Sequence, residues 1–191
     1  MTSPGRAEWL DLGLEQLGNE GLQGLRIATL CSAAGKTTGS FYHHFQDHGA
    51  YVLALVEHWK EHATDRIVAT ARAQSDRSSL GVLNELALEL DPVLELRIRQ
   101  LAEREPEAVD ALAAVDAARL DFLAELYQNE GGARLELARD LALLDYSAFL
   151  GFALLRGGAD PKAAERLAAL MEGLAGAYVA IDPTRTGRGS A

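Results

Sequence analysis

The sequence contains a single cysteine, Cys31, among its 191 residues. One cysteine cannot form a disulfide within the chain, and the lack of a disulfide framework is typical of proteins from reducing compartments. We therefore expect Cys31 to behave as a small buried hydrophobic residue.

Long uncharged apolar segments are also missing. The most apolar stretch, residues 149–155, is far shorter than the roughly 18 residues that a membrane-spanning helix needs. Near the first residue, Arg6, Glu8 and Asp11 leave no continuous apolar core of the kind found in signal peptides. These absences predict a cytoplasmic protein without a membrane anchor.

Basic residues are scarce, with 18 Lys and Arg against 28 Asp and Glu and a formal net charge of −10. Over residues 1–48 only Arg6, Arg26 and Lys36 are basic, whereas five residues are acidic. Affinity for nucleic acid normally depends on cations that neutralise phosphates. A nucleic-acid-binding surface here would need its few cations on one face, or two binding modules tethered together.

The apolar residues recur at helical spacing, and no alternating strand pattern is present. The sequence therefore predicts an all-α fold of about nine helices. Proline at 92, 106 and 161 stands where a first helical residue is expected, and the glycine pairs at 131–132 and 157–158 stand where helices should end. The later helices are expected at residues 80–90, 92–104, 106–130, 135–156 and 161–181.

At the front of the chain, Ser3 and Pro4 predict a helix start, with Ser3 as the cap. Gly18, Gly21 and Gly24 then interrupt the helical pattern. Their spacing resembles that of a phosphate-binding loop, but no strand precedes them and no Lys-Ser/Thr pair follows. We therefore interpret the glycines as a turn.

Residues 25–45 have the pattern of a helix-turn-helix. A short apolar helical segment ends at Gly35, where a left-handed conformation would allow a turn of about three or four residues. Thr37 can then cap the next helix through its side-chain oxygen. Asp47 is expected to cap a long fourth helix in the same way.

The second helix of this motif has a small, hydroxylated first turn from Thr37 to Ser40. Such residues allow a helix N-terminus to approach phosphates or base edges closely. Phe41 and Phe45 lie four residues apart and can anchor the helix to its own domain. The residues between them are left to face outward or sideways, which favours DNA binding as the function.

Residues 35–45 resemble the recognition segment of the TetR family of bacterial transcriptional regulators. They are closest to a branch that carries Gly-Ser-Phe-Tyr followed by an aromatic residue, His and Phe. The similarity continues more diffusely at Trp59 and at residues 63–66, 95–99 and 115–119.

The resemblance implies a helix-turn-helix DNA-binding domain at residues 1–46 and a helical effector-binding and dimerisation domain at 47–182. The polar, glycine-containing residues 183–191 are expected to form a flexible tail. The resemblance also implies a homodimeric one-component regulator, a repressor that a small-molecule effector releases from operator DNA. Neither catalytic residues nor a cofactor or metal is expected. An alternative, suggested by the acidic front domain, is a regulator-like fold that has lost DNA binding and acts as a ligand or protein-interaction module.

In the family, DNA is contacted from the recognition helix and its flanks. Thr37 and Tyr42 are expected to hold phosphates, whereas Thr38, Ser40 and His43 reach toward bases. The branch usually carries Lys at position 38 and Lys or Arg at position 48. Tyr42 and His44 could instead pack within the domain. The expected DNA-binding residues are Lys36, Thr37, Thr38, Gly39, Ser40, Tyr42, His43, His44 and His48.

The last two helices carry apolar residues on more than one face, which predicts a partner. The resemblance implies a four-helix dimer interface, and the alternative is the internal core of a monomer. The expected interface residues are Leu144, Ala148, Phe152, Leu167, Leu170, Leu174 and Tyr178.

A mainly apolar effector pocket is expected between the middle helices. Arg97 or Arg119 could bind an anionic group there, but an ion pair between one of the nearby arginines and Asp116 is the favoured interpretation. The expected pocket residues are Trp59, Arg97, Arg119, Phe122, Tyr127, Tyr146 and Phe149.

The segment from His58 to His62 has the H-x-x-E-H form of some metallopeptidases, in which two histidines four residues apart could hold Zn²⁺. A zinc hydrolase is therefore a third hypothesis. No further ligand stands at a telling spacing, so two exposed histidines on a charged helix face are the favoured interpretation.

Overall fold

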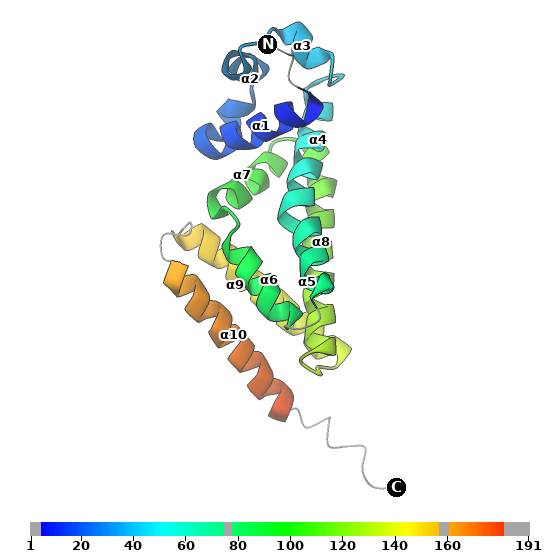
Figure 1. Cartoon of the computed structure of the whole chain (residues 1–191), viewed down its shortest axis with the longest axis vertical. Helices are drawn as coiled ribbons and strands as arrows, with labels where there is room; N and C mark the ends of the chain where they lie inside the picture. The colour runs from blue at the N-terminus through cyan, green and yellow to red at the C-terminus, as the bar shows by residue number, and fades with distance from the viewer. Residues whose placement is uncertain (1–4, 75–77, 157–160, 182–191) are drawn as a thin grey trace. The chain divides into compact units, whose positions relative to one another are not determined.

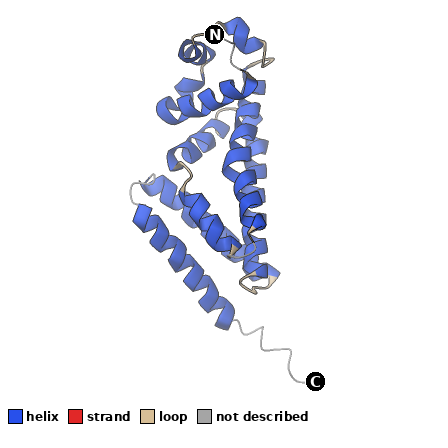
Figure 2. Cartoon of the chain, viewed as in Figure 1, coloured by secondary structure: helices blue, strands red, loops and turns tan. Residues whose placement is uncertain are grey.

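The computed structural model describes residues 5–74, 78–156 and 161–181 (Figure 1). Within these residues every regular element is a helix and none is a strand (Figure 2), which confirms the all-α prediction. The α-helices are α1 (Arg6–Glu20), α2 (Ile27–Ala34), α3 (Thr38–Tyr42), α4 (His48–Lys60), α5 (Arg66–Ala73), α6 (Ser79–Leu88), α7 (Pro92–Ala102), α8 (Pro106–Asn129), α9 (Leu135–Arg156) and α10 (Pro161–Ile181).

Two shorter helical elements complete the described part of the chain. A 3₁₀ helix, η1 (Gly21–Leu25), follows α1, and a π-helical turn, η2 (Glu61–Asp65), joins α4 to α5. Because α4, η2 and α5 run on without a break, the described residues form the predicted nine helices. The sequence analysis treated residues 47–67 as one regular helix and did not predict the π-helical turn.

The helix starts agree closely with the capping signals in the sequence. Pro92, Pro106 and Pro161 are each the first residue of a helix. The side chain of Asp47 accepts a hydrogen bond from the amide of Ala50 at 2.8 Å, as expected for an N-cap.

The first helix departs from its prediction. It begins at Arg6, after Gly5 in an extended conformation, and the Gly5 amide donates to the carboxylate of Glu8 at 2.6 Å. A side chain three residues into the helix therefore satisfies this amide. Ser3 and Pro4, the glycine pair at 157–158 and the predicted tail at 183–191 lie outside the described residues.

The chain forms two compact units. Unit 1 comprises residues 1–67 and 90–117, and unit 2 comprises residues 68–89 and 118–191. The helix-turn-helix thus belongs to the same compact unit as α4, α7 and the first part of α8. The functional boundary between residues 46 and 47 stays a prediction.

Unit 1 has an aromatic core built around α1, α3 and α4. Trp9, Phe41 and Tyr51 are fully buried, and the Phe41 ring meets the other two in edge-on contacts at centroid distances of 5.6 and 5.1 Å. A side chain at Gly13 would collide with the Tyr51 hydroxyl, so the absence of a side chain allows α1 and α4 to approach closely. Burial also raises the pKa of Tyr51, which keeps its hydroxyl neutral.

Unit 2 has a separate core between α6, α9 and the second part of α8. Phe122, Tyr127, Leu141 and Tyr146 are buried there among alanines and leucines. Helix α10 contacts α6 and α9. None of the helices in the described residues is long and apolar enough to cross a membrane.

Candidate functional site

The turn between α2 and α3 has the geometry that the sequence predicts. Gly35 ends α2 in the left-handed conformation, with φ 62° and ψ 35°. Two residues later Thr37 is the N-cap of α3, and its hydroxyl oxygen accepts a hydrogen bond from the amide of Ser40 at 3.4 Å. Residues 27–42 therefore form a helix-turn-helix, because a glycine allows the reversal and a threonine starts the second helix.

Helix α3 is short and firmly anchored. Its α-helical part spans only Thr38–Tyr42, and the chain continues through a turn at His43 and His44. Phe41 is fully buried, and its ring lies 5.2 Å from the buried ring of Phe45. The predicted anchoring by these two phenylalanines is confirmed, and it fixes which side of α3 faces solvent.

The opposite side of α3 is open to solvent. The exposed members of the predicted DNA-binding set are small or polar, with Tyr42 the largest at 52% exposure. They are Thr37, Thr38, Gly39, Tyr42 and His43. Lys36, just before this group, and Ser40, within it, are half-buried.

His44 and His48 are half-buried as well. The ring of His44 lies 5.0 Å from that of His43, and its buried Nε2 has no hydrogen-bond partner within the described residues. His48 contacts the main-chain oxygen of Leu25 through Nε2 at 3.2 Å, and its Nδ1 lies 3.9 Å from the carboxylate of Glu105. Since a carbonyl oxygen can only accept, Nε2 of His48 is the donor.

The three basic residues at the front of the chain differ in position. The guanidinium of Arg6 lies over the ring of Phe45 at 5.3 Å, which places one cation beside the end of the recognition segment. Lys36 immediately precedes Thr37, and Arg26 is exposed at the N-cap of α2. Arg6 therefore lies beside Phe45, which follows α3, and Lys36 directly precedes the N-cap of α3 in the sequence.

Most of the predicted pocket residues belong to unit 2. Arg119 lies over the ring of Tyr146 at 5.8 Å and donates to its hydroxyl at 3.2 Å. The rings of Tyr146 and Phe149 are stacked with centroids 6.2 Å apart. Phe122 is buried beneath the guanidinium of Arg72 at 5.1 Å. Polar and aromatic side chains of α8 and α9 thus meet inside unit 2.

Asp145 was missed by the sequence analysis. The hydroxyl of Tyr127 donates to its carboxylate at 2.8 Å. Burial raises the pKa of Asp145, and the hydrogen bond from Tyr127 partly opposes that shift. The sequence does contain a signal, because Asp145 is the only charged residue between Asp140 and Arg156 on an otherwise apolar helix.

Trp59 and Arg97 lie in unit 1, apart from the other pocket candidates. Trp59 is part of the unit 1 core. Arg97 donates to Gln100 at 2.9 Å, and its guanidinium packs against Gly21 at the start of η1. A role for these two residues in effector binding stays a prediction.

The expected ion pair with Asp116 is present, and its partner is Arg99. The guanidinium of Arg99 donates to both carboxylate oxygens of Asp116, at 2.7 and 3.1 Å. It also donates to one carboxylate oxygen of Glu95 at 2.9 Å. Glu95 is only 2% exposed and was missed, although Ile98 and Ala102 share its helix face at i+3 and i+7. The network joins α7 to the first part of α8 within unit 1.

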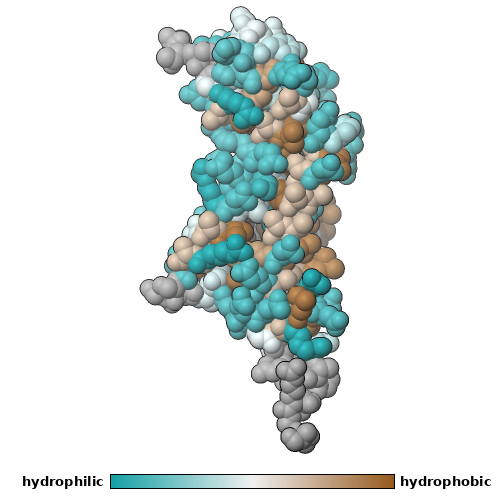
Figure 3. Space-filling view, turned by 90° about the vertical axis from the view of Figure 1, so that its right-hand side faces the viewer, coloured by the Kyte–Doolittle hydropathy of each residue, from teal (hydrophilic) through white to brown (hydrophobic). Residues whose placement is uncertain are grey.

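The predicted dimer residues fall into two groups. Ala148, Phe152 and Leu167 are half-buried within unit 2. More than half of the surface of the other four is exposed, although all are large and apolar: Leu144, Leu170, Leu174 and Tyr178. Figure 3 shows one face of the chain, on which hydrophobic residues reach the surface between hydrophilic ones.

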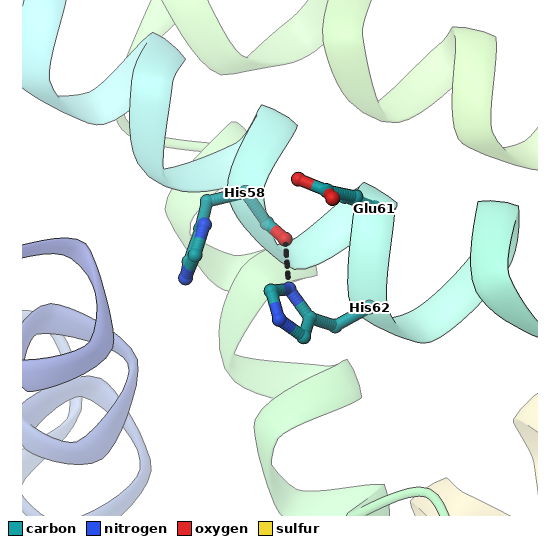
Figure 4. Close-up of side chains that lie close together, drawn as sticks. All are labelled: His58, Glu61 and His62. Atoms are coloured by element: carbon teal, nitrogen blue, oxygen red, sulfur yellow. Dashed lines mark hydrogen bonds between the residues drawn. The ribbon is translucent and has the colours of Figure 1, made fainter. Parts of the chain in front are cut away.

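The structure also brings together the residues of the H-x-x-E-H segment. One ligand atom from each of His58, Glu61 and His62 lies within 4.8 Å of the others, and the two ring centroids are 4.5 Å apart. Figure 4 shows the three side chains along one stretch of helix, where α4 passes into the π-helical turn. His62 and Glu61 are exposed, as the sequence interpretation expected, whereas His58 is half-buried.

No family model matches the sequence, and no curated protein matches it. A solved transcriptional regulator from Rhodococcus sp. RHA1 is 16% identical with a TM-score of 0.77, over 90% of this chain and 95% of that one. A putative TetR/AcrR family regulator is 20% identical with a TM-score of 0.68, over 87% and 97%. A putative regulator from Saccharomonospora viridis, solved in complex with choline, is 18% identical with a TM-score of 0.68, over 93% and 96%. At these identities the similarity shows the fold, which is that of TetR-type transcriptional regulators.

Proposed function

We propose that the protein is a homodimeric transcriptional regulator, a repressor that binds operator DNA through its helix-turn-helix. The observation that carries this proposal is the two-sided character of α3. Phe41 locks one side into an aromatic core, and Thr38, Tyr42 and His43 are presented to solvent on the other. An anchored helix with exposed polar residues is the usual form of a major-groove reader.

The regulator fold supports the same conclusion, since helix-turn-helix dimers read two half-sites with recognition helices about 34–36 Å apart. Pairing two modules also compensates for the scarcity of cations, because the second contact becomes intramolecular. Arg6, beside Phe45, supplies a positive charge near the recognition helix. Thr37 and Tyr42 hold phosphates in this proposal, and Thr38, Ser40 and His43 face base edges.

The proposed effector is a small, largely apolar molecule bound within unit 2, where Phe122, Tyr127, Tyr146 and Phe149 meet. Arg119 and Asp145 would orient its polar groups. Such a molecule releases the operator only if it binds more tightly to the conformation that does not fit DNA. Thermal-shift screening of compounds, followed by their effect on operator affinity, would identify it.

The direct test is fluorescence anisotropy with DNA from around the protein's own gene, measured over a range of salt concentrations. We expect specific binding, and the logarithm of the association constant should fall linearly with the logarithm of the salt concentration. The absence of specific binding even at low salt would reject the proposal.

Thr38→Lys refines the test. The added cation should tighten binding to all sequences and steepen the salt slope by about one unit, since it adds one phosphate contact. Thr70→Lys is the matched control, because Thr70 is exposed on α5 and lies outside the helix-turn-helix. Equal effects of the two substitutions would show that position 38 is away from DNA.

A second candidate is a regulator fold that binds ligands or proteins without binding DNA. The observation in its favour is the charge of residues 1–48, where five acidic residues outnumber three basic ones. Anisotropy separates the two functions, because this candidate predicts no specific DNA binding together with retained effector-induced thermal stabilisation.

A further inference from the structure

The rings of His58 and His62 are held by different partners. Nδ1 of His62 lies 2.8 Å from the main-chain oxygen of His58, and Nε2 of His58 lies 2.6 Å from the carboxylate of Asp11. A carbonyl oxygen and a carboxylate both accept hydrogen bonds, so both of these ring nitrogens donate. In each neutral ring, the other nitrogen then carries a lone pair: Nδ1 in His58 and Nε2 in His62.

This arrangement is the one that metal-binding histidines use. A ligating histidine donates its second ring N–H to a carboxylate or a main-chain carbonyl, which sets the tautomer and the ring orientation. Here one histidine uses Asp11 on α1 and the other uses the helix backbone. These two contacts set the tautomer of each ring and leave one ring nitrogen of each histidine with a lone pair.

The third ligand comes from the same stretch of helix. The carboxylate of Glu61 lies beside the two rings, within the 4.8 Å cluster (Figure 4). Arg66 approaches one of its oxygens at 3.6 Å, which leaves the second oxygen for an ion. The π-helical turn begins at Glu61, and such turns alter the spacing of side chains relative to a regular helix.

We propose that His58, Glu61 and His62 form a binding site for one divalent transition-metal ion of the zinc type, with Asp11 as a positioning residue. Two imidazole nitrogens and one carboxylate oxygen suit Zn²⁺, Ni²⁺ or Cu²⁺ and disfavour Mg²⁺ and Ca²⁺. Three protein ligands leave at least one coordination position to water. The site lies wholly within unit 1.

The test is calorimetric titration of the untagged, chelator-stripped full chain with ZnCl₂. We expect one zinc ion per chain and no uptake of MgCl₂ under the same conditions. His62→Ala should weaken zinc binding at least tenfold, and Glu61→Gln should weaken it about tenfold. Asp11→Asn should weaken it about 10- to 100-fold while the stoichiometry remains one, because the ligands are still present.

Matched controls separate the site from general surface binding. His43→Ala removes an exposed histidine elsewhere, and Glu57→Gln removes an exposed carboxylate one turn before Glu61. Both should leave zinc binding unchanged, and circular dichroism should show that every variant keeps the helical content of the wild type. No zinc uptake by the wild type, or equal affinities for His62→Ala and His43→Ala, would overturn the proposal.

Discussion

The two units of the molecule bury their side chains differently. Among the described residues, unit 1 exposes only four large hydrophobic side chains, whereas unit 2 exposes nine. Unit 1 encloses its aromatic rings in one contiguous core, in which Trp9, Phe41 and Tyr51 have no exposed surface. Unit 2 leaves leucines on α9 and α10 in contact with solvent.

The difference indicates that the units have different requirements for stability. A buried aromatic cluster can hold a short recognition helix in place without a partner. An exposed row of large apolar residues is characteristic of an interaction surface. Unit 1 therefore holds α3 with a few polar side chains exposed. We propose that the exposed apolar residues of unit 2 serve association, which the following predictions test.

The largest effect is expected from breaking the core of unit 1. Phe41→Ala should lower the free energy of unfolding by about 3–5 kcal/mol, because it removes a fully buried ring and leaves a cavity. Tyr42→Ala, at the next position but exposed, should change stability by less than about 0.5 kcal/mol. Urea unfolding followed by circular dichroism gives both values.

Both variants should weaken DNA binding at temperatures where they are folded, since Phe41 anchors α3. Tyr42→Ala is expected to weaken operator affinity despite its normal stability. Equal unfolding energies for the two variants would contradict the two-sided description of α3.

The next effect concerns association through unit 2. Leu170→Glu combined with Leu174→Glu should weaken dimerisation roughly hundredfold, equivalent to about 2.7 kcal/mol, because charged groups would be buried against a partner. Analytical ultracentrifugation over a concentration series measures the dissociation constant.

Leu53→Glu and Val109→Glu provide controls for the dimer prediction. Both positions are exposed apolar sites in unit 1. We expect the dimer to tolerate these changes. If the unit 1 variants dissociate it and the unit 2 variants do not, the comparison between the units is wrong.

A smaller effect is expected at the start of α6. Glu130 accepts hydrogen bonds from the Ser78 hydroxyl at 2.6 Å and the Ser79 amide at 2.9 Å. Burial acts to raise the pKa of Glu130, but these hydrogen bonds outweigh it and leave the pKa below its ordinary value of 4.5. Glu130→Gln should therefore cost about 1 kcal/mol at pH 7, as for loss of a helix cap.

The pH dependence of that cost follows from the direction of the shift. The stabilisation by Glu130 is complete above the unfolded-state pKa near 4.5 and is lost as the pH falls through the lower folded-state pKa. The stabilities of the wild type and Glu130→Gln should therefore converge in acid. A difference that is constant between pH 7 and pH 3 would contradict this assignment.

The smallest effect, with the opposite sign, is expected at Asp145. Burial raises the pKa of Asp145 in the folded protein above its ordinary value of 3.8, so the folded state binds this proton more tightly than the unfolded state does. The contribution of Asp145 to stability is therefore greatest below pH 3.8 and falls as the pH rises toward the folded-state pKa. Asp145→Asn should remove that decline and raise stability at pH 7 by less than about 1 kcal/mol. Thermal unfolding of both proteins at several pH values tests it, and a clear destabilisation at pH 7 would count against it.

Local signals in the sequence predicted most helix boundaries. Gly35, Thr37 and Asp47 mark turns and caps whose hydrogen bonds join neighbouring residues, so their geometry needs no distant partner. The anchoring of α3 was also predictable, because two phenylalanines four residues apart share a helix face. The predicted start of α1 was wrong, since either a serine or a glutamate can satisfy the same orphan amides.

The sequence alone thus determined the helical class, the helix-turn-helix and the two faces of α3, because these depend on residues close together in the chain. The tertiary structure decided the rest. It paired Arg99 with Asp116, and it placed Asp11 against His58. Such contacts join side chains on different helices. Which side chains meet depends on how the helices pack against each other, and the local sequence does not specify that packing.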